Sequence, residues 1–154
     1  MIIGRLVLLV SAEPAGWGGK RSAFPAECRF CIVRKETEEI VGQVNYCGYT
    51  GKSAKVEIGI EIDYSDRGKG YGEDALYHFL DYLFLTMHVR LVKLAVMVNN
   101  QVARQLYQKL GFLQDKLVQA GGYDAAAETF ADIVLMGLTA DRWLVQRRKY
   151  VFKT

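Results

Sequence analysis

The stretch Asp66-Arg67-Gly68-Lys69-Gly70-Tyr71-Gly72 decides the fold, because a strand pattern precedes it and a helix pattern follows it. Before it, residues 56–62 alternate in character, with isoleucines at 58, 60 and 62 on one face of an expected strand. After it, apolar residues recur at helical spacing: Ala75, Leu76, Phe79, Leu80 and Leu83. A strand, a glycine-rich loop and a helix in this order are typical of phosphate-binding sites.

Three features of this loop favour a phosphate ligand. Glycine lets the backbone turn sharply and lets a ligand approach the N–H groups closely. The first turn of a helix adds unpaired N–H donors and a partial positive charge, and Arg67 and Lys69 add full positive charges. The loop therefore predicts a ligand that carries a di- or triphosphate. The alternative is a glycine-rich turn that serves only to begin the helix.

Two other nucleotide-binding motifs fit this chain poorly. The glycines do not follow the order Gly-x-Gly-x-x-Gly, and no early strand–helix–strand unit with a suitably placed acid is present, which argues against a Rossmann site. Gly51-Lys52-Ser53 resembles the end of a P-loop, but that motif requires glycine at position 46, where this chain has Tyr46. We interpret residues 48–53 as a turn.

The rest of the pattern predicts a mixed chain of strands and helices. Expected strands occupy residues 5–10, 30–34, 40–46, 90–98, 112–119 and 133–138, a second helix occupies 101–110, and loops or turns occupy 15–22, 35–39 and 120–124. This mixture predicts an α+β or α/β class with a partly antiparallel sheet. We expect one domain over residues 1–154, with a core from about 30 to 138 and a basic tail at 141–154.

The composition excludes several classes of protein. With 51% hydrophobic residues and only 2 Pro, the chain is neither disordered nor collagen-like. No apolar run approaches the ~20 residues of a membrane span, and residues 1–10 lack the features of a signal peptide. The 3 Cys suit a reducing cytoplasm, and Cys28 and Cys31 have no second pair for zinc, so we expect a cytoplasmic protein without a metal. A net charge of +3 is too mild to favour nucleic acid.

A second motif lies along the expected helix at 101–110. It reads Asn-x-x-Ala-x-x-Leu-Tyr-x-x-x-Gly-Phe, from Asn100 to Phe112. At 3.6 residues per turn, Asn100, Ala103 and Tyr107 share one face of the helix. The small Ala103 would let a ligand come close, and Tyr107 would present a phenol to it. The alternative is that Tyr107 is a core aromatic.

The two motifs together resemble those of the GNAT N-acetyltransferase superfamily. Arg67-x-x-Gly70-x-Gly72 after a strand is similar to that family's acetyl-CoA pyrophosphate loop, and the Asn100–Phe112 block is similar to its next motif. With Glu57-Ile58-Gly59 upstream, the sequence of the motif most resembles the branch of ribosomal-protein and spermidine N-acetyltransferases. The resemblance implies a mixed, mostly antiparallel central sheet in a three-layer α/β sandwich. Helices flank this sheet, which splits in a V between its fourth and fifth strands.

The resemblance also implies how the cosubstrate, acetyl-CoA, is held without a metal. The cosubstrate would lie in the V-shaped gap, and its pantetheine would pair with backbone near Ile60 and Ile62. Asn100 would bond the pantetheine or order the end of the split strand, and Ala103 would allow close approach. The pyrophosphate would accept N–H groups beside the Arg67 side chain, from Gly68, Lys69, Gly70, Tyr71 and Gly72.

The implied reaction is acetyl transfer to a primary amine by direct attack on the thioester in a ternary complex. The amine must first lose a proton, because an ammonium has no lone pair. Glu57 is the first candidate base and Glu61, on the same face of a regular strand, is the second. A bulge, frequent in this strand of the family, would change which carboxylate points inward, and a water chain is a further alternative. Tyr107 would protonate the departing thiolate.

The chain departs from the family between its first two strands. Relatives place one or two helices there to cover the acceptor site, whereas residues 11–30 are short and Gly-rich. The acceptor side would be open, or completed by a second subunit of a homodimer. The acceptor itself, a small-molecule amine or a protein N-terminal amine, is left open by the sequence. The alternative function is a catalytically inactive CoA-binding module, a sensor or assembly partner; a nucleotide-binding domain is a third.

Overall fold

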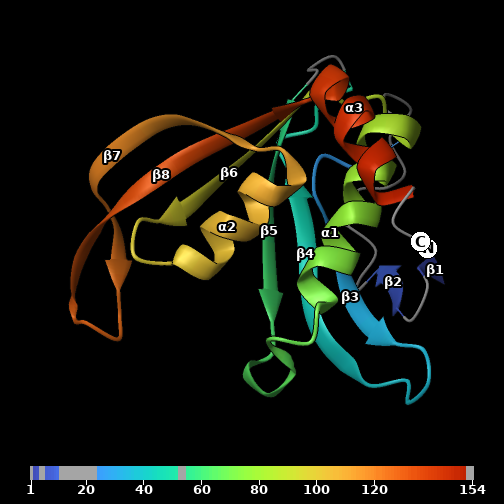
Figure 1. Ribbon diagram of the computed structural model, residues 1–154, viewed down its shortest axis with the longest axis horizontal. Coiled ribbons are helices and arrows are strands. Elements are labelled where there is room, and N and C mark those ends of the chain that lie inside the picture. Colours follow the sequence, from blue (N-terminus) through green and yellow to red (C-terminus); the bar gives the residue numbers. More distant parts are fainter. Residues whose placement is uncertain (1, 4–5, 11–23, 52–54, 152–154) are drawn as a thin grey trace. The chain divides into compact units, whose positions relative to one another are not determined.

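The computed structural model describes residues 2–3, 6–10, 24–51 and 55–151, and it divides into two compact units, residues 1–90 and 91–154 (Figure 1). The loop expected at 15–22 and the end of the turn expected at 48–53 lie outside the described residues. None of the described helices is long and apolar enough to cross a membrane.

An antiparallel sheet forms the framework of the first unit. Its strands lie in the order of the chain, and each pairs with the next in antiparallel register. They are β1 (Ile2–Ile3), β2 (Leu6–Val10), β3 (Cys28–Arg34), β4 (Ile40–Cys47) and β5 (Lys55–Ile62). After β5 come the 3-10 turn η1 (Tyr64–Asp66), the helix α1 (Tyr71–Asp81) and its π-helical continuation η2 (Tyr82–Thr86).

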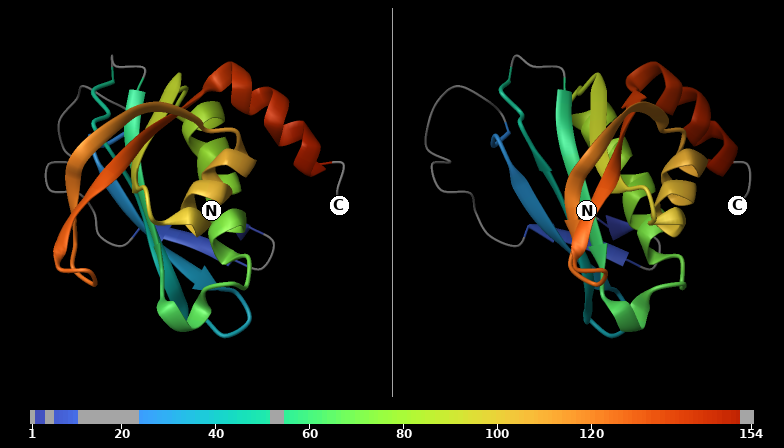
Figure 2. Two further views of the ribbon diagram at one scale, coloured as in Figure 1. Left: turned by 60° about the vertical axis from the view of Figure 1, so that its left-hand side comes forward. Right: turned by 90° about the vertical axis from the view of Figure 1, so that its left-hand side faces the viewer.

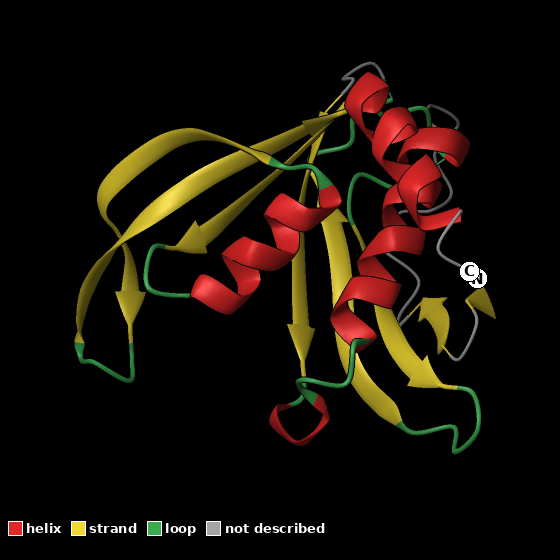
Figure 3. Ribbon diagram, viewed as in Figure 1, coloured by secondary structure: helices red, strands yellow, loops and turns green. Residues whose placement is uncertain are grey.

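One face of this sheet packs against α1 and forms the core of the first unit (Figure 3). Phe79 of α1 meets Phe30 of β3 edge to face, with ring centroids 5.6 Å apart, and stacks against Tyr46 of β4 at 6.4 Å. The helix buries the apolar residues that the sequence pattern assigned to its inner face: Ala75, Leu76, Phe79 and Leu80, followed by Leu83 of η2. Within the first unit, α1 lies on one side of the sheet (Figure 2).

The second unit combines three antiparallel strands with two helices among its described residues. They are β6 (Leu91–Met97), α2 (Gln101–Leu110), β7 (Leu113–Asp124), β8 (Thr129–Thr139) and α3 (Ala140–Val151). β8 lies between β6 and β7 and pairs with both. The helix α2 has the bounds that the sequence predicts, because Asn100 caps its start and Gly111 ends it in a left-handed conformation with φ of 105°.

The expected loop at 120–124 is wrong, because these residues belong to β7. Gly122 and Tyr123 pair with Ala131 and Phe130 of β8. The pairing shifts between Val118 and Gly122, where Ala120 takes a positive φ of 48° and its N–H donates to Asp132 Oδ1 at 2.8 Å. Small residues are typical of a loop, but here pairing with β8 holds them in an irregular strand.

The helix α3 lies where the sequence analysis expected a basic tail. Thr139 begins it, since its Oγ1 accepts a hydrogen bond from the Arg142 N–H at 3.3 Å. Trp143 is fully buried, and Arg142 Nε donates to the Gly111 carbonyl at 2.6 Å. The basic side chains conceal this helix in the sequence, and the buried ring of Trp143 helps to anchor it in the structure.

The buried hydroxyl of Tyr46 should make the stability of the first unit depend on pH. Its hydroxyl donates to the Pro25 carbonyl at 3.1 Å, and burial raises the pKa of Tyr46 well above its usual value. A raised pKa means that the folded chain holds this proton more tightly than the unfolded chain. The stabilisation is therefore complete below about pH 10, the ordinary tyrosine pKa, and is lost as the pH rises further.

We therefore expect the free energy of unfolding to fall more steeply above pH 10 in the wild type than in Tyr46→Phe. At neutral pH the variant should lose about 1 kcal/mol with its hydrogen bond. Urea unfolding at pH 7, 9, 10 and 11 measures both effects. Burial also raises the pKa of Tyr82 and Tyr107, which adds the same slope to both proteins. Parallel pH profiles would contradict the role given to Tyr46.

Candidate functional site

The glycine-rich loop joins η1 to the N-terminus of α1, and its glycines adopt conformations that other residues avoid. Gly68 and Gly70 have φ of 76° and 82°. A Cβ built on Gly68 would meet no atom within 4 Å, so the space beside it is open to a ligand. Both glycines are thus required by the backbone turn, and the turn leaves the main chain approachable.

The N-terminus of α1 has the features of an anion site. Gly70 is its N-cap residue and offers no side-chain cap. The Asp74 N–H donates to the Gly70 carbonyl at 3.1 Å, which begins the hydrogen-bond ladder of the helix. The N–H groups of a helix's first turn precede this ladder and point toward its N-terminal end. These N–H groups and the helix dipole favour a negatively charged ligand. Tyr71 and Gly72, predicted as binding residues, lie in this turn.

The two cations of the loop are exposed and anchored locally. Arg67 Nε donates to the Ile62 carbonyl at 3.0 Å, and its guanidinium carbon lies 5.6 Å from the centre of the Tyr64 ring. Lys69 Nζ donates to Asp66 Oδ1 at 3.2 Å. Both charges therefore remain beside the loop and can reach an anion there.

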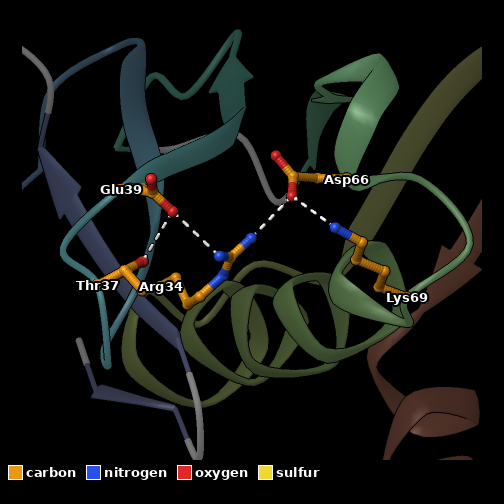
Figure 4. A network of polar contacts seen from close by, with 5 residues as sticks. All are labelled: Arg34, Thr37, Glu39, Asp66 and Lys69. Carbon is orange, nitrogen blue, oxygen red and sulfur yellow. Dashed lines mark hydrogen bonds and ion pairs between the residues drawn. The ribbon is translucent and has the colours of Figure 1, made fainter.

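Arg34 of β3 joins the loop to the β3–β4 hairpin, and sequence reasoning missed it. Its Nη2 donates to Asp66 Oδ1 at 2.8 Å, and its Nη1 donates to Glu39 Oε2 at 3.0 Å (Figure 4). The contact with Asp66 links residues 32 positions apart. Nothing local in the sequence pairs these two residues.

The two carboxylates predicted on β5 lie on the same face of a regular strand. The β4–β5 register runs without a shift from Gly42 opposite Ile62 to Cys47 opposite Glu57. The bulge considered for this strand is therefore absent from the described β4–β5 pairing. Both Glu57 and Glu61 are exposed, and Glu61 Oε2 accepts a hydrogen bond from Gln43 Nε2 at 3.2 Å.

The negative charge of Glu57 also affects the pKa of a neighbouring thiol, that of Cys47. Burial raises the pKa of Cys47, and the negative charges of Glu57 and Glu27 add to the increase. Cys47 is the cross-strand partner of Glu57. On the same strand, Ile60 and Ile62, predicted to contact the pantetheine, are partly exposed and pair with Val44 and Gly42.

In the second unit, side-chain hydrogen bonds hold the chain at the N-terminus of α2. Asn100 Oδ1 accepts the Ala103 N–H at 3.2 Å, which is an N-cap bond. Asn99 Nδ2 donates to Asp124 Oδ2 at 2.9 Å, and this bond lowers the pKa of Asp124 together with the Ala127 and Ala126 amides. Ala103 is partly exposed. The N-cap bond explains Asn100 structurally, and its predicted contact with the cosubstrate stays a prediction.

Tyr107 projects from the buried side of α2. It is 8% exposed, and its ring meets that of Phe112 edge to face at 5.8 Å. Burial raises the pKa of Tyr107 above its ordinary value. The phenol therefore stays protonated at neutral pH, as a proton donor must. The same packing suits a core aromatic.

The predicted residues divide between the two units. The loop and the β5 residues belong to the first unit, and Asn100, Ala103 and Tyr107 belong to the second. The V-shaped split predicted between the strands at 56–62 and 90–98 falls at the junction of the units and stays a prediction. Among the described residues, no three His, Cys, Asp or Glu side chains are grouped as a metal ion would need.

Comparison with known proteins identifies N-acetyltransferases among the relatives of this chain. An uncharacterized N-acetyltransferase, p20, of Bacillus licheniformis is 26% identical over 110 residues, which cover 71% of this chain and 61% of that protein. The spermidine N(1)-acetyltransferase of Vibrio cholerae is 30% identical over 92 residues, covering 58% of this chain and 51% of that protein. The chain thus spans only about half to three fifths of these relatives' lengths.

A solved structure shows the same fold. It is a dodecameric structure of the spermidine N-acetyltransferase from Vibrio cholerae, with a TM-score of 0.72 and 24% identity over 77% of this chain and 68% of that one. The predicted α+β fold of the GNAT type is therefore confirmed, and so is the predicted likeness to the spermidine branch. Residues 9–112, more than half of the chain, match the family, and the chain belongs to the acetyltransferase (GNAT) family.

Proposed function

We propose that the chain is an acetyl-CoA-dependent N-acetyltransferase that transfers an acetyl group to a primary amine. The observation that carries the proposal is the N-terminus of α1, whose N-cap Gly70 offers no side-chain hydrogen bond, behind a loop with two left-handed glycines, in a chain of this family. Open space at Gly68 and the cations of Arg67 and Lys69 fit a pyrophosphate. The amides of residues 68–72 would hold it, and Ile60, Ile62, Asn100 and Ala103 would serve the pantetheine.

Acetyl-CoA would supply a thioester that an amine attacks directly, with no covalent enzyme intermediate. A free alkyl amine has a pKa of about 10, so most of it is protonated at neutral pH and a base is needed. Glu57 is our first candidate base and Glu61 the second. The neutral phenol of Tyr107 would protonate the thiolate of the departing coenzyme A.

The acceptor is a small-molecule primary amine in this proposal. The named relative acts on spermidine, so polyamines belong among the first acceptors to test. The free thiols of Cys28, Cys31 and Cys47 agree with a reducing cytoplasm as the place of action. The dodecamer of the related structure supports self-association, which light scattering would measure.

The proposal is tested by release of free thiol from acetyl-CoA in the presence of a panel of primary amines. Amine-dependent release above buffer hydrolysis is the expected result. Binding of acetyl-CoA with no turnover across a broad panel would favour a catalytically inactive CoA-binding module. A larger thermal shift with ATP or NAD than with CoA would favour a nucleotide-binding domain, because a ligand at about 100 times its Kd stabilises by about 2.7 kcal/mol.

The paired carboxylates of β5 allow the base to be identified. We expect Glu57→Gln to lower kcat about tenfold at pH 7, below the usual range for a base, because Glu57 is exposed and water can also take the proton. Glu61→Gln, a matched change on the same face, should change kcat little. The Glu57→Gln defect should shrink toward pH 10, where the amine loses its proton unaided. A larger loss in Glu61→Gln would transfer the role to that residue.

A further inference from the structure

We propose that Arg34 is a positioning residue that sets the conformation of the 67–70 loop by holding the residues on both sides of it. This inference rests on the proposed binding of acetyl-CoA by that loop. Arg34 Nη2 donates to Asp66 Oδ1 at 2.8 Å, immediately before the loop. The Arg34 guanidinium carbon also lies 5.4 Å from the centre of the Tyr71 ring, immediately after the loop.

The contact between Arg34 and Asp66 is largely shielded from water. The side chain of Arg34 is 20% exposed and that of Asp66 is 13% exposed. Surface ion pairs contribute little, whereas a shielded, charge-assisted hydrogen bond is stronger and has one preferred geometry. This pair can therefore hold the start of the loop in place.

Arg34 is itself fixed by the β3–β4 hairpin. Its Nη1 donates to Glu39 Oε2 at 3.0 Å, and Thr37 Oγ1 donates to the same oxygen at 3.0 Å (Figure 4). The Arg34 N–H also donates to the Glu39 carbonyl at 2.8 Å. The guanidinium thus has one carboxylate on each side and links the hairpin to the start of the loop.

The contacts of Arg34 with Asp66 and Tyr71 form a tether across the loop, and this tether matters because the loop contains two glycines. Gly68 and Gly70 give the backbone many conformations to lose when a ligand binds. A loop already held in its binding conformation loses fewer of them, so affinity improves without any direct contact to the ligand. Loss of the tether should raise the Kd for acetyl-CoA and leave kcat at saturation unchanged.

Because Arg34 and Asp66 carry opposite charges, their variants distinguish a positioning role from simple electrostatic attraction of acetyl-CoA. If charge alone mattered, Arg34→Ala would weaken binding of the anionic cosubstrate, and Asp66→Ala would strengthen it by removing a negative charge. If positioning matters, both changes weaken binding, and the double variant is no weaker than the worse single variant. Arg34→Lys should also weaken binding, because one ammonium cannot span Asp66 and Glu39 as the planar guanidinium does.

Isothermal titration with acetyl-CoA at low and high salt tests the inference in folded protein, with circular dichroism as the folding check. We expect Arg34→Lys and Asp66→Ala each to raise the Kd roughly tenfold, with kcat unchanged and the loss kept at high salt. Arg148→Ala, an exposed arginine of α3, is the matched control and should bind like the wild type.

The inference is overturned if Asp66→Ala binds acetyl-CoA more tightly than the wild type, or if Asp66→Ala and Arg34→Lys both bind it as the wild type does. In either case, binding of acetyl-CoA by the wild type would still support the proposed function. A wild type that does not bind acetyl-CoA would overturn both.

Discussion

Replacement of Gly70 by glutamate is expected to weaken the binding of acetyl-CoA at least about a hundredfold. Gly70 has a φ of 82°, which costs an ordinary residue about 1–2 kcal/mol. The new carboxylate would also stand at the N-terminus of α1, where the pyrophosphate is proposed to bind, and would repel it. Isothermal titration with acetyl-CoA gives the change in Kd.

Gly48 provides a matched control for this substitution. It also has a φ of 82°, and a Cβ there would meet no atom within 4 Å. Gly48→Glu therefore imposes similar backbone strain and the same charge in the turn after β4, at the opposite end of the β4–β5 pair from the 67–70 loop. It should lose stability and keep its affinity for acetyl-CoA. Undiminished binding by Gly70→Glu would refute the pyrophosphate site.

Substitution of Tyr107 by phenylalanine is expected to lower kcat by about a hundredfold to a thousandfold, as the loss of a general acid does. The ring and its contact with Phe112 remain, so the melting temperature and the Kd for acetyl-CoA should change little. Because burial raises the pKa of Tyr107, the wild type should keep its proton donor up to and beyond pH 10. Steady-state kinetics with a saturating amine measure the loss.

Tyr123→Phe is the control for the Tyr107 variant. Tyr123 lies on β7 with 53% of its surface exposed, and its loss of a hydroxyl should leave kcat unchanged. A Tyr107→Phe enzyme with wild-type kcat would show that Tyr107 is a core aromatic, the alternative that its burial also suits.

Local patterns predicted much of the fold and the loop. Isoleucines at alternate positions predicted β5, and Gly111 predicted the end of α2, because periodicity and helix stops depend on neighbouring residues only. The same reasoning failed at residues 120–124, where β8 imposes strand pairing on a sequence that resembles a loop. It also missed α3, whose order depends on the burial of Trp143.

By itself, the sequence determined that a helix follows a glycine-rich loop, and that the chain carries two motifs of one enzyme family. Only the tertiary structure decided which residue holds that loop, since Arg34 and Asp66 meet across 32 positions of chain. It also decided that β5 is regular, so that Glu57 and Glu61 share a face. Backbone turns and helix caps are encoded locally, whereas ion pairs and strand register arise when distant segments pack together.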